Sequence, residues 1–121
     1  MNNPPLPEPW LRGTLTDVPP IQRAVLHALE LAQEDLERWC GPLSDEELNA
    51  IPDGIAPVAF HLRHIARSLD RLLTYAEGKQ LAPGQIALLK SELEPGAQGN
   101  ELFSELHAAL ATSAARVRST G

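Results

Sequence analysis

The sequence is poor in the residues that mark several common classes of protein. Its single cysteine, Cys40, cannot form an internal disulfide, which is typical of a reducing, cytoplasmic environment. Aromatic residues make up only 4% of the chain, and no run of five alternates β-branched or aromatic with polar residues. No apolar run approaches the roughly 20 residues of a membrane-spanning helix. We therefore expect an all-α, cytoplasmic protein without a membrane segment.

Basic residues are also scarce. The formal net charge is −6 over 121 residues, which argues against a nucleic-acid partner, because neutralising phosphates requires clustered Lys and Arg. The one basic concentration is Arg63, Arg67 and Arg71, spaced four apart on one helical face. Asp70 lies beside these arginines, so we interpret them as an ordinary solvated face. The length predicts a single domain.

Proline and apolar spacing divide the chain in two. Residues 1–16 carry prolines at 4, 5, 7 and 9 and predict an extended leader, which we expect Trp10 to anchor. Residues 17–121 form the predicted helical domain, with long helices over about 17–40, over 57–77, and from Asn100 onward. Short helices are predicted at 44–51 and from residue 83. Expected caps are Thr16 or Asp17, a Ser44–Glu47 capping box, and Asn100.

Each long helix has one apolar stripe, which we expect to face the core. The expected core positions are Ile21, Val25, Leu29, Ala32, Leu36 and Trp39 in the first long helix, Val58, Leu62, Ile65, Leu69, Leu72 and Ala76 in the second, and Phe103, Leu106, Leu110, Ala114 and Val117 in the last.

Histidines are the strongest candidates for chemistry, since the chain has neither a glycine-rich phosphate loop nor a Cys-x-x-Cys pair. His61 is predicted to lie within the apolar stripe of the second long helix, and His64, Ser68 and Tyr75 line one edge of that stripe. Two imidazoles three residues apart can reach one metal ion. The alternative is a core His61 bonded to a backbone carbonyl, with His64 half exposed.

The other polar candidates are weaker. His107 lies in the apolar stripe of the last helix and could face His61 and His64 across the core; the alternative is a bulky polar residue at a helix margin. His27 points away from its helix's stripe and is predicted to be exposed. Cys40 ends an apolar stripe and is interpreted as a packed thiol.

Three segments carry a family resemblance. Residues 55–67 (IAPVAFHLRHIAR), 43–48 (LSDEEL) and 8–14 (EPWLRGT) resemble the DinB-like superfamily of bacterial four-helix-bundle proteins, over about residues 9–111. The resemblance implies an up-down helical bundle. It also implies a divalent metal, usually zinc or nickel, held by the histidine matching His64 and by two more, four residues apart on the last helix of the bundle.

The chain departs from that pattern in its last helix. It contains no His-x-x-x-His pair, and its final helix resembles the third long helix of the family, so the fourth bundle helix is missing from these 121 residues. His64 carries over, with His61 as its neighbour and His107 as a third candidate ligand. A bundle without its fourth helix exposes part of its core, and large apolar patches usually mark interfaces. We therefore expect a homo-oligomer, a dimer, joined through this apolar groove.

Two functions remain open at this point, and so does whether the chain is an enzyme. The first is a DinB-like helical module that acts by association and has a vestigial or incomplete metal site. The alternative, implied by the resemblance, is a metal-dependent thiol S-transferase or isomerase. In such enzymes the metal lowers the pKa of a low-molecular-weight thiol. Ser68 and Tyr75 would line its pocket, and a missing C-terminal helix or a partner subunit would complete the site.

Overall fold

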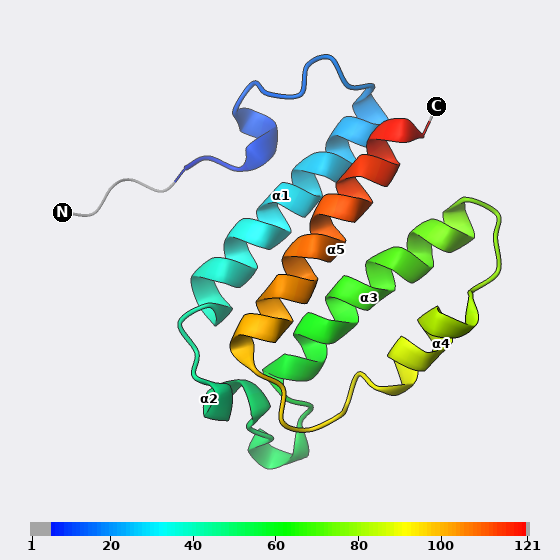
Figure 1. The fold of residues 1–121 in the computed structure, drawn as a ribbon. Helices are drawn as coiled ribbons and strands as arrows, with labels where there is room; N and C mark the ends of the chain where they lie inside the picture. Colours follow the sequence, from blue (N-terminus) through cyan, green and yellow to red (C-terminus); the bar gives the residue numbers. More distant parts are fainter. Residues whose placement is uncertain (1–5, 121) are drawn as a thin grey trace.

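The computed structural model describes residues 6–120, and the regular secondary structure of this part of the chain is all helical, without a strand. Its elements are a 3₁₀ turn at Pro9–Leu11, α1 (Pro20–Cys40), α2 (Asp45–Asn49), a 3₁₀ turn at Pro52–Gly54, α3 (Val58–Ala76), α4 (Pro83–Lys90) and α5 (Gly99–Ser119) (Figure 1). The predicted all-α bundle of three long helices with short connecting helices is confirmed. Residues 1–5 of the predicted leader and residue 121 lie outside the described residues. Within residues 6–120, no helix has the length and apolar character to cross a membrane.

The start of α1 differs from the prediction. Neither Thr16 nor Asp17 caps the helix; Pro19 occupies the cap position and makes no side-chain cap bond. A proline in the first helical turn has no N–H to satisfy, so the sequence can begin a helix there without a polar cap. Arg23 instead fastens the preceding segment, because its Nη2 donates to the carbonyl oxygen of Val18 at 2.8 Å.

Asp45, the first residue of α2, links the beginning of α2 to the beginning of α5. The predicted capping box is present: the Ser44 hydroxyl accepts from Glu47 N at 3.1 Å, and Glu47 Oε1 accepts from Ser44 N at 3.0 Å. Asn100 is not the cap of α5. The helix begins at Gly99, whose N–H donates to Asp45 Oδ1 at 2.7 Å. A Cβ at Gly99 would lie only 3.2 Å from that oxygen, so glycine permits the close approach.

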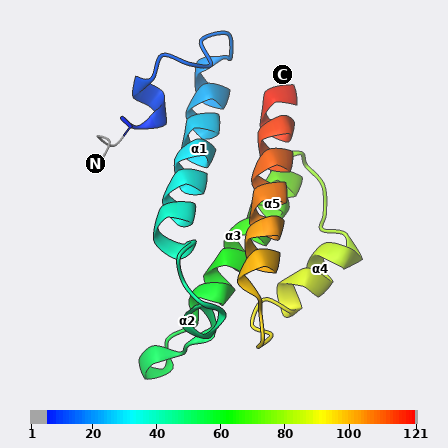
Figure 2. The same ribbon diagram turned by 60° about the vertical axis from the view of Figure 1, so that its left-hand side comes forward.

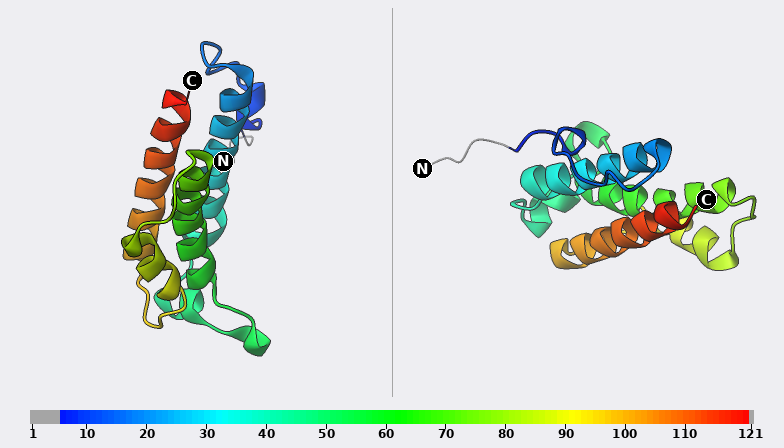
Figure 3. Two further views of the ribbon diagram at one scale, coloured as in Figure 1. Left: turned by 90° about the vertical axis from the view of Figure 1, so that its right-hand side faces the viewer. Right: turned by 90° about the horizontal axis from the view of Figure 1, so that it is seen from above.

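Helix α5 is the central element of the bundle. It packs along α3 and also against α1, and these are the main contacts between long helices. Helices α3 and α5 run in the same direction and α1 runs opposite to both (Figures 1 and 2). The three long helices do not lie in one plane, and α4 lies on the side of α3 away from α1 (Figure 3). Consequently α5 covers one side of α1 and of α3.

The core lies mainly between α3 and α5, closed at one end by α2. Its buried members are Leu48, Ala59, Leu62, Ala66, Ala97, Leu102, Leu106 and Leu110. On α5 the buried residues recur at helical steps of three and four from Leu102 to Val117. Leu62 and Leu106 are completely inaccessible to solvent.

The face that α3 presents to α5 is rotated from the predicted one. Ala59, Leu62 and Ala66 are buried, whereas Leu72 is 62% exposed. Alanine side chains let two helices approach closely, so α5 packs on the small residues of α3. The apolar residues of α3 cover too much of its circumference for periodicity to choose one face. The same error occurs in α1, where Leu26 is buried and Ile21 is 80% exposed.

The leader packs against α1, but not through Trp10. Trp10 is exposed, while Pro9 is fully buried. Arg12 makes a paired contact with Glu34 of α1, both N···O distances being 2.7 Å. A bidentate guanidinium–carboxylate pair fixes orientation as well as position. The leader is therefore fastened by this ion pair rather than by the indole ring.

A pair of matched truncations in α3 tests the rotated core face. Leu62→Ala is expected to lower the free energy of unfolding by about 2–5 kcal/mol, because it leaves a cavity between α3 and α5. Leu72→Ala, the same change on an exposed position, is expected to stay within about 0.5 kcal/mol. Urea denaturation at low protein concentration, followed by circular dichroism, measures both. Equal losses would mean that the core face is centred on the predicted stripe.

Candidate functional site

The candidate residues of α3 lie on two different sides of the helix. By helical register, His61, Ser68 and Tyr75 lie on the side that neither α5 nor α4 covers. His61 is therefore exposed and is not in the core as predicted, because the helix is rotated. Tyr75 is exposed, and the Ser68 hydroxyl donates to the Ile65 carbonyl oxygen within the helix at 3.2 Å. His61 and Tyr75 thus face outward, and Ser68 is half-buried.

His64 belongs instead to a polar cluster between α3 and the segment that follows α4. Its Nδ1 lies 3.0 Å from Oε1 of Glu92, and Oε2 of Glu92 accepts from Arg71 Nη1 at 2.7 Å. Glu92 is only 3% exposed, so two partners satisfy a buried carboxylate. The Phe60 ring stacks on the His64 imidazole, with a centroid distance of 5.6 Å. The imidazole is thereby held in one orientation.

Electrostatics keep Glu92 charged. Burial by itself raises the pKa of this carboxyl, and hydrogen bonds from His64 and Arg71 outweigh burial, so the pKa of Glu92 lies below its ordinary value. A neutral His64 donates Nδ1–H to this carboxylate, which leaves Nε2 with a free lone pair. Metal-binding histidines are commonly oriented by such a carboxylate. The geometry thus leaves His64 Nε2 available to ligate a metal ion.

The described residues of one chain do not form a complete metal site. His107 lies on the α1 side of α5, where its Nε2 contacts Glu37, so it does not join His61 and His64. Within residues 6–120, no group of three or more His, Cys, Asp or Glu side chains is arranged to hold a metal ion. Catalytic zinc normally has three protein ligands. The histidines that the structure describes therefore do not fit the three-ligand site that the family resemblance implies.

His27 is buried and is not the exposed residue that its helical position predicts. Only 4% of it is accessible, and its Nδ1 lies 3.1 Å from Oε1 of Glu30. On the same side of α1, Arg23 binds the Val18 carbonyl oxygen and Glu34 binds the leader's arginine, so the segment before α1 packs along this side of the helix. A helical pattern identifies the side facing away from the bundle core, but it does not reveal a segment that packs there.

Arginines gave the signal that could have located Glu92. Arg63, Arg67 and Arg71 are not a solvated face, because all three turn toward the α4 segment. Their Nη1 atoms donate to the Glu94 carbonyl oxygen, the Leu88 carbonyl oxygen and the Glu92 carboxylate, each at 2.7–2.8 Å. Three arginines on one helical stripe require acceptors, and the segment after α4 supplies them. The local sequence around Glu92 carries no such signal.

Neutralising Glu92 tests the cluster. Glu92→Gln is expected to lower the free energy of unfolding at neutral pH by about 1–3 kcal/mol, because Arg71 loses its buried charged partner. The pKa of Glu92 is depressed in the folded state, so its stabilisation is present above the ordinary carboxyl pKa and is lost as pH falls. The difference between wild type and variant should therefore shrink in acid.

Chemical denaturation across acid and neutral pH measures this difference. Glu94→Gln, two residues away on an exposed side chain, is the matched control and should leave stability unchanged. A Glu92→Gln variant as stable as this control would mean that the buried carboxylate contributes nothing.

A scan of protein families gives one match that covers most of the chain. The family model described as the DinB superfamily matches residues 28–120, from the middle of α1 to the end of α5. No curated protein and no solved structure gives a significant match. The matched region contains the main core cluster between α3 and α5, His64 and Glu92. On this evidence, and in agreement with its three-helix core, the chain belongs to the DinB superfamily.

Proposed function

We propose that this chain is a helical-bundle module that acts by association, and that its partner is a second copy of itself. The observation that supports the proposal is a set of large exposed apolar side chains on the sides of α1 and α3 that α5 does not cover. We call this surface the open face. It is made of the exposed apolar side chains Ile21, Val25 and Trp39 of α1 and Leu72 and Tyr75 of α3.

The two halves of the open face lie on the same side of the molecule. Leu29 of α1 and Leu69 of α3 both border the core beneath α5. On each helix, the positions next to these residues and farther from α5 are Val25 of α1 and Leu72 of α3. Because α1 and α3 run in opposite directions, we place both positions on the side of the molecule opposite α5. The open face is therefore a two-helix layer of the kind that α5 covers on its other side.

A second copy is the occupant that fits this layer. Two such layers, packed face to face by a two-fold axis, place four helices around one apolar core, which is a stable arrangement of helices. The five side chains that define the open face are uncharged, although the chain has a net charge of −6; exposed His61 lies on the same side of α3. Self-repulsion between two acidic copies is therefore weakest here, and apolar burial supplies the driving force.

Charge substitutions with matched controls test the association. Ile21→Glu and Leu72→Glu are expected to weaken the dimer about tenfold or more, because each places a carboxylate in an apolar contact. Ile55→Glu and Leu93→Glu make the same changes at comparably exposed positions outside the open face and should have no effect. Sedimentation velocity over a concentration series measures the dissociation constant. A wild type that stays monomeric at high micromolar concentration would contradict the proposal.

The metal-dependent thiol S-transferase or isomerase is the second candidate function, favoured by the orientation of His64 by Glu92. Because no group of three or more ligand side chains forms among the described residues, we expect well under one zinc or nickel ion per chain after metal loading and gel filtration. Elemental mass spectrometry measures this ratio. One metal ion per chain, lost in His64→Ala but kept in His27→Ala, would contradict the expectation and favour the enzyme.

A further inference from the structure

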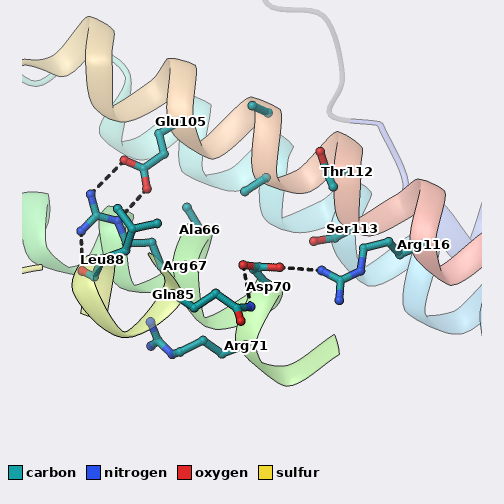
Figure 4. Close-up of a pocket in the computed structure, with 12 residues that line it drawn as sticks. Ala66, Arg67, Asp70, Arg71, Gln85, Leu88, Glu105, Thr112, Ser113 and Arg116 are labelled. Atoms are coloured by element: carbon teal, nitrogen blue, oxygen red, sulfur yellow. Dashed lines mark hydrogen bonds and ion pairs between the residues drawn. The ribbon is translucent and has the colours of Figure 1, made fainter. Parts of the chain in front are cut away.

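A cleft of about 340 Å³ lies between α3, α4 and α5 (Figure 4). This volume is in the range of pockets that bind small molecules. The cleft lies on the side of α3 that faces α4 and α5, whereas His61 and the open face lie on the uncovered side. Neither the association of two copies nor a histidine-based metal site makes use of it.

The polar groups that line the cleft are already satisfied. Each arginine of the lining pairs with a carboxylate at 2.7 Å: Arg67 with Glu105, Arg71 with Glu92, and Arg116 with Asp70. Within residues 6–120, no buried side-chain nitrogen or oxygen lacks a hydrogen-bond partner. A charged ligand would leave water here without gaining a partner of opposite charge, which is unfavourable. The lining therefore favours an uncharged ligand.

The rest of the lining is apolar and incompletely covered. Ala66 of α3, Ala108 and Ala109 of α5, and Leu88 of α4 contribute to it. Helix α4 has no buried residue, and Leu88 is 45% exposed. Burial of apolar surface is favourable in proportion to the area removed from water. A ligand that contacts both Leu88 and the alanines therefore buries apolar surface that the folded chain leaves in water.

Ion pairs limit the length of the cleft and hold its walls in place. Figure 4 shows the Arg67–Glu105 pair at one end of the lining and the Arg116–Asp70 pair at the other. Glu105 and Arg116 are about three helical turns apart on α5. A helix or an extended peptide laid along α5 would have to cross one of these pairs, whereas a small molecule fits between them. Arg67 also donates to the Leu88 carbonyl oxygen at 2.8 Å, so the α4 wall is preorganised.

We propose that this cleft binds a small uncharged apolar molecule, such as a monocyclic aromatic hydrocarbon. Its body contacts the alanines of α3 and α5 on one side and Leu88 of α4 on the other. A cavity of about 150 Å³ lined by apolar side chains holds benzene, so a cleft of about 340 Å³ admits a ring with a short substituent. This site is separate from both His64 and the open face.

Three probes of similar size separate apolar contact from charge. Ethylbenzene, benzylammonium and benzoate are titrated into the ¹⁵N-labelled chain, and amide shifts are followed around Ala66, Ala109 and Ser113. Ethylbenzene is expected to bind with a dissociation constant of about a millimolar or below, and both ions at least about fivefold more weakly, because neither finds a free charged partner. An ion that binds as tightly as ethylbenzene would overturn the proposal. Shifts confined to the open face, or no shifts at these amides, would do the same.

Two matched pairs of variants test the location. Ala108→Leu fills the cleft and should weaken ethylbenzene binding about tenfold or more, whereas Ala115→Leu, at an exposed position of α5 outside the lining, should leave it unchanged. Leu88→Ala removes the α4 wall and should weaken binding about threefold or more. Leu89→Ala changes a neighbour of similar exposure that does not line the cleft and should have no effect.

Circular dichroism confirms that each of these variants folds. Ethylbenzene binding that survives Ala108→Leu, or that is weakened equally by both members of a pair, would overturn the assignment of the ligand to this cleft.

Discussion

The contact between α3 and α5 determines where every other feature of the molecule lies. Ala59, Leu62 and Ala66 of α3 pack against the leucines of α5, with Leu62 and Leu106 fully buried. Because the alanines let the two backbones approach, this contact fixes the rotation of α3 about its axis. That rotation turns the arginines toward α4, directs His61 outward, and leaves the cleft beside Ala66.

Electrostatics then attach the rest of the chain to this core. Helix α4 and the segment after it have few buried apolar residues, and they are held by arginines of α3 that reach the carbonyl oxygen of Leu88 in α4 and, after α4, the Glu92 carboxylate and the Glu94 carbonyl oxygen. The leader is held in the same way, by Arg12 on Glu34. A small domain with a modest core thus uses charge-assisted hydrogen bonds to position its peripheral segments. One of these attachments also orients His64.

The candidate site shows which of its residues could be predicted from sequence patterns and which could not. His64 was identifiable as the residue that carries the family resemblance, and its helix was predictable from apolar periodicity. Its partner Glu92 lies 28 positions away in an irregular segment, where no local pattern marks it. His107 was expected to face the same site, yet it contacts Glu37 of α1. Spacing along one helix gives relative directions on that helix, but it does not give the rotation of one helix against another.

The sequence by itself determined the all-α class, the bounds of the helices to within a few residues, the capping box at Ser44 and the membership in the DinB superfamily. These depend on local propensities, on proline and glycine positions, and on matches along the chain. Only the tertiary structure decided which faces are buried, that His27 is buried, and that Arg71 and Ser113 border one cleft. The physical reason is that apolar residues cover more of α1 and α3 than one contact can bury. Which part is buried is decided by the closest packing of the neighbouring helix.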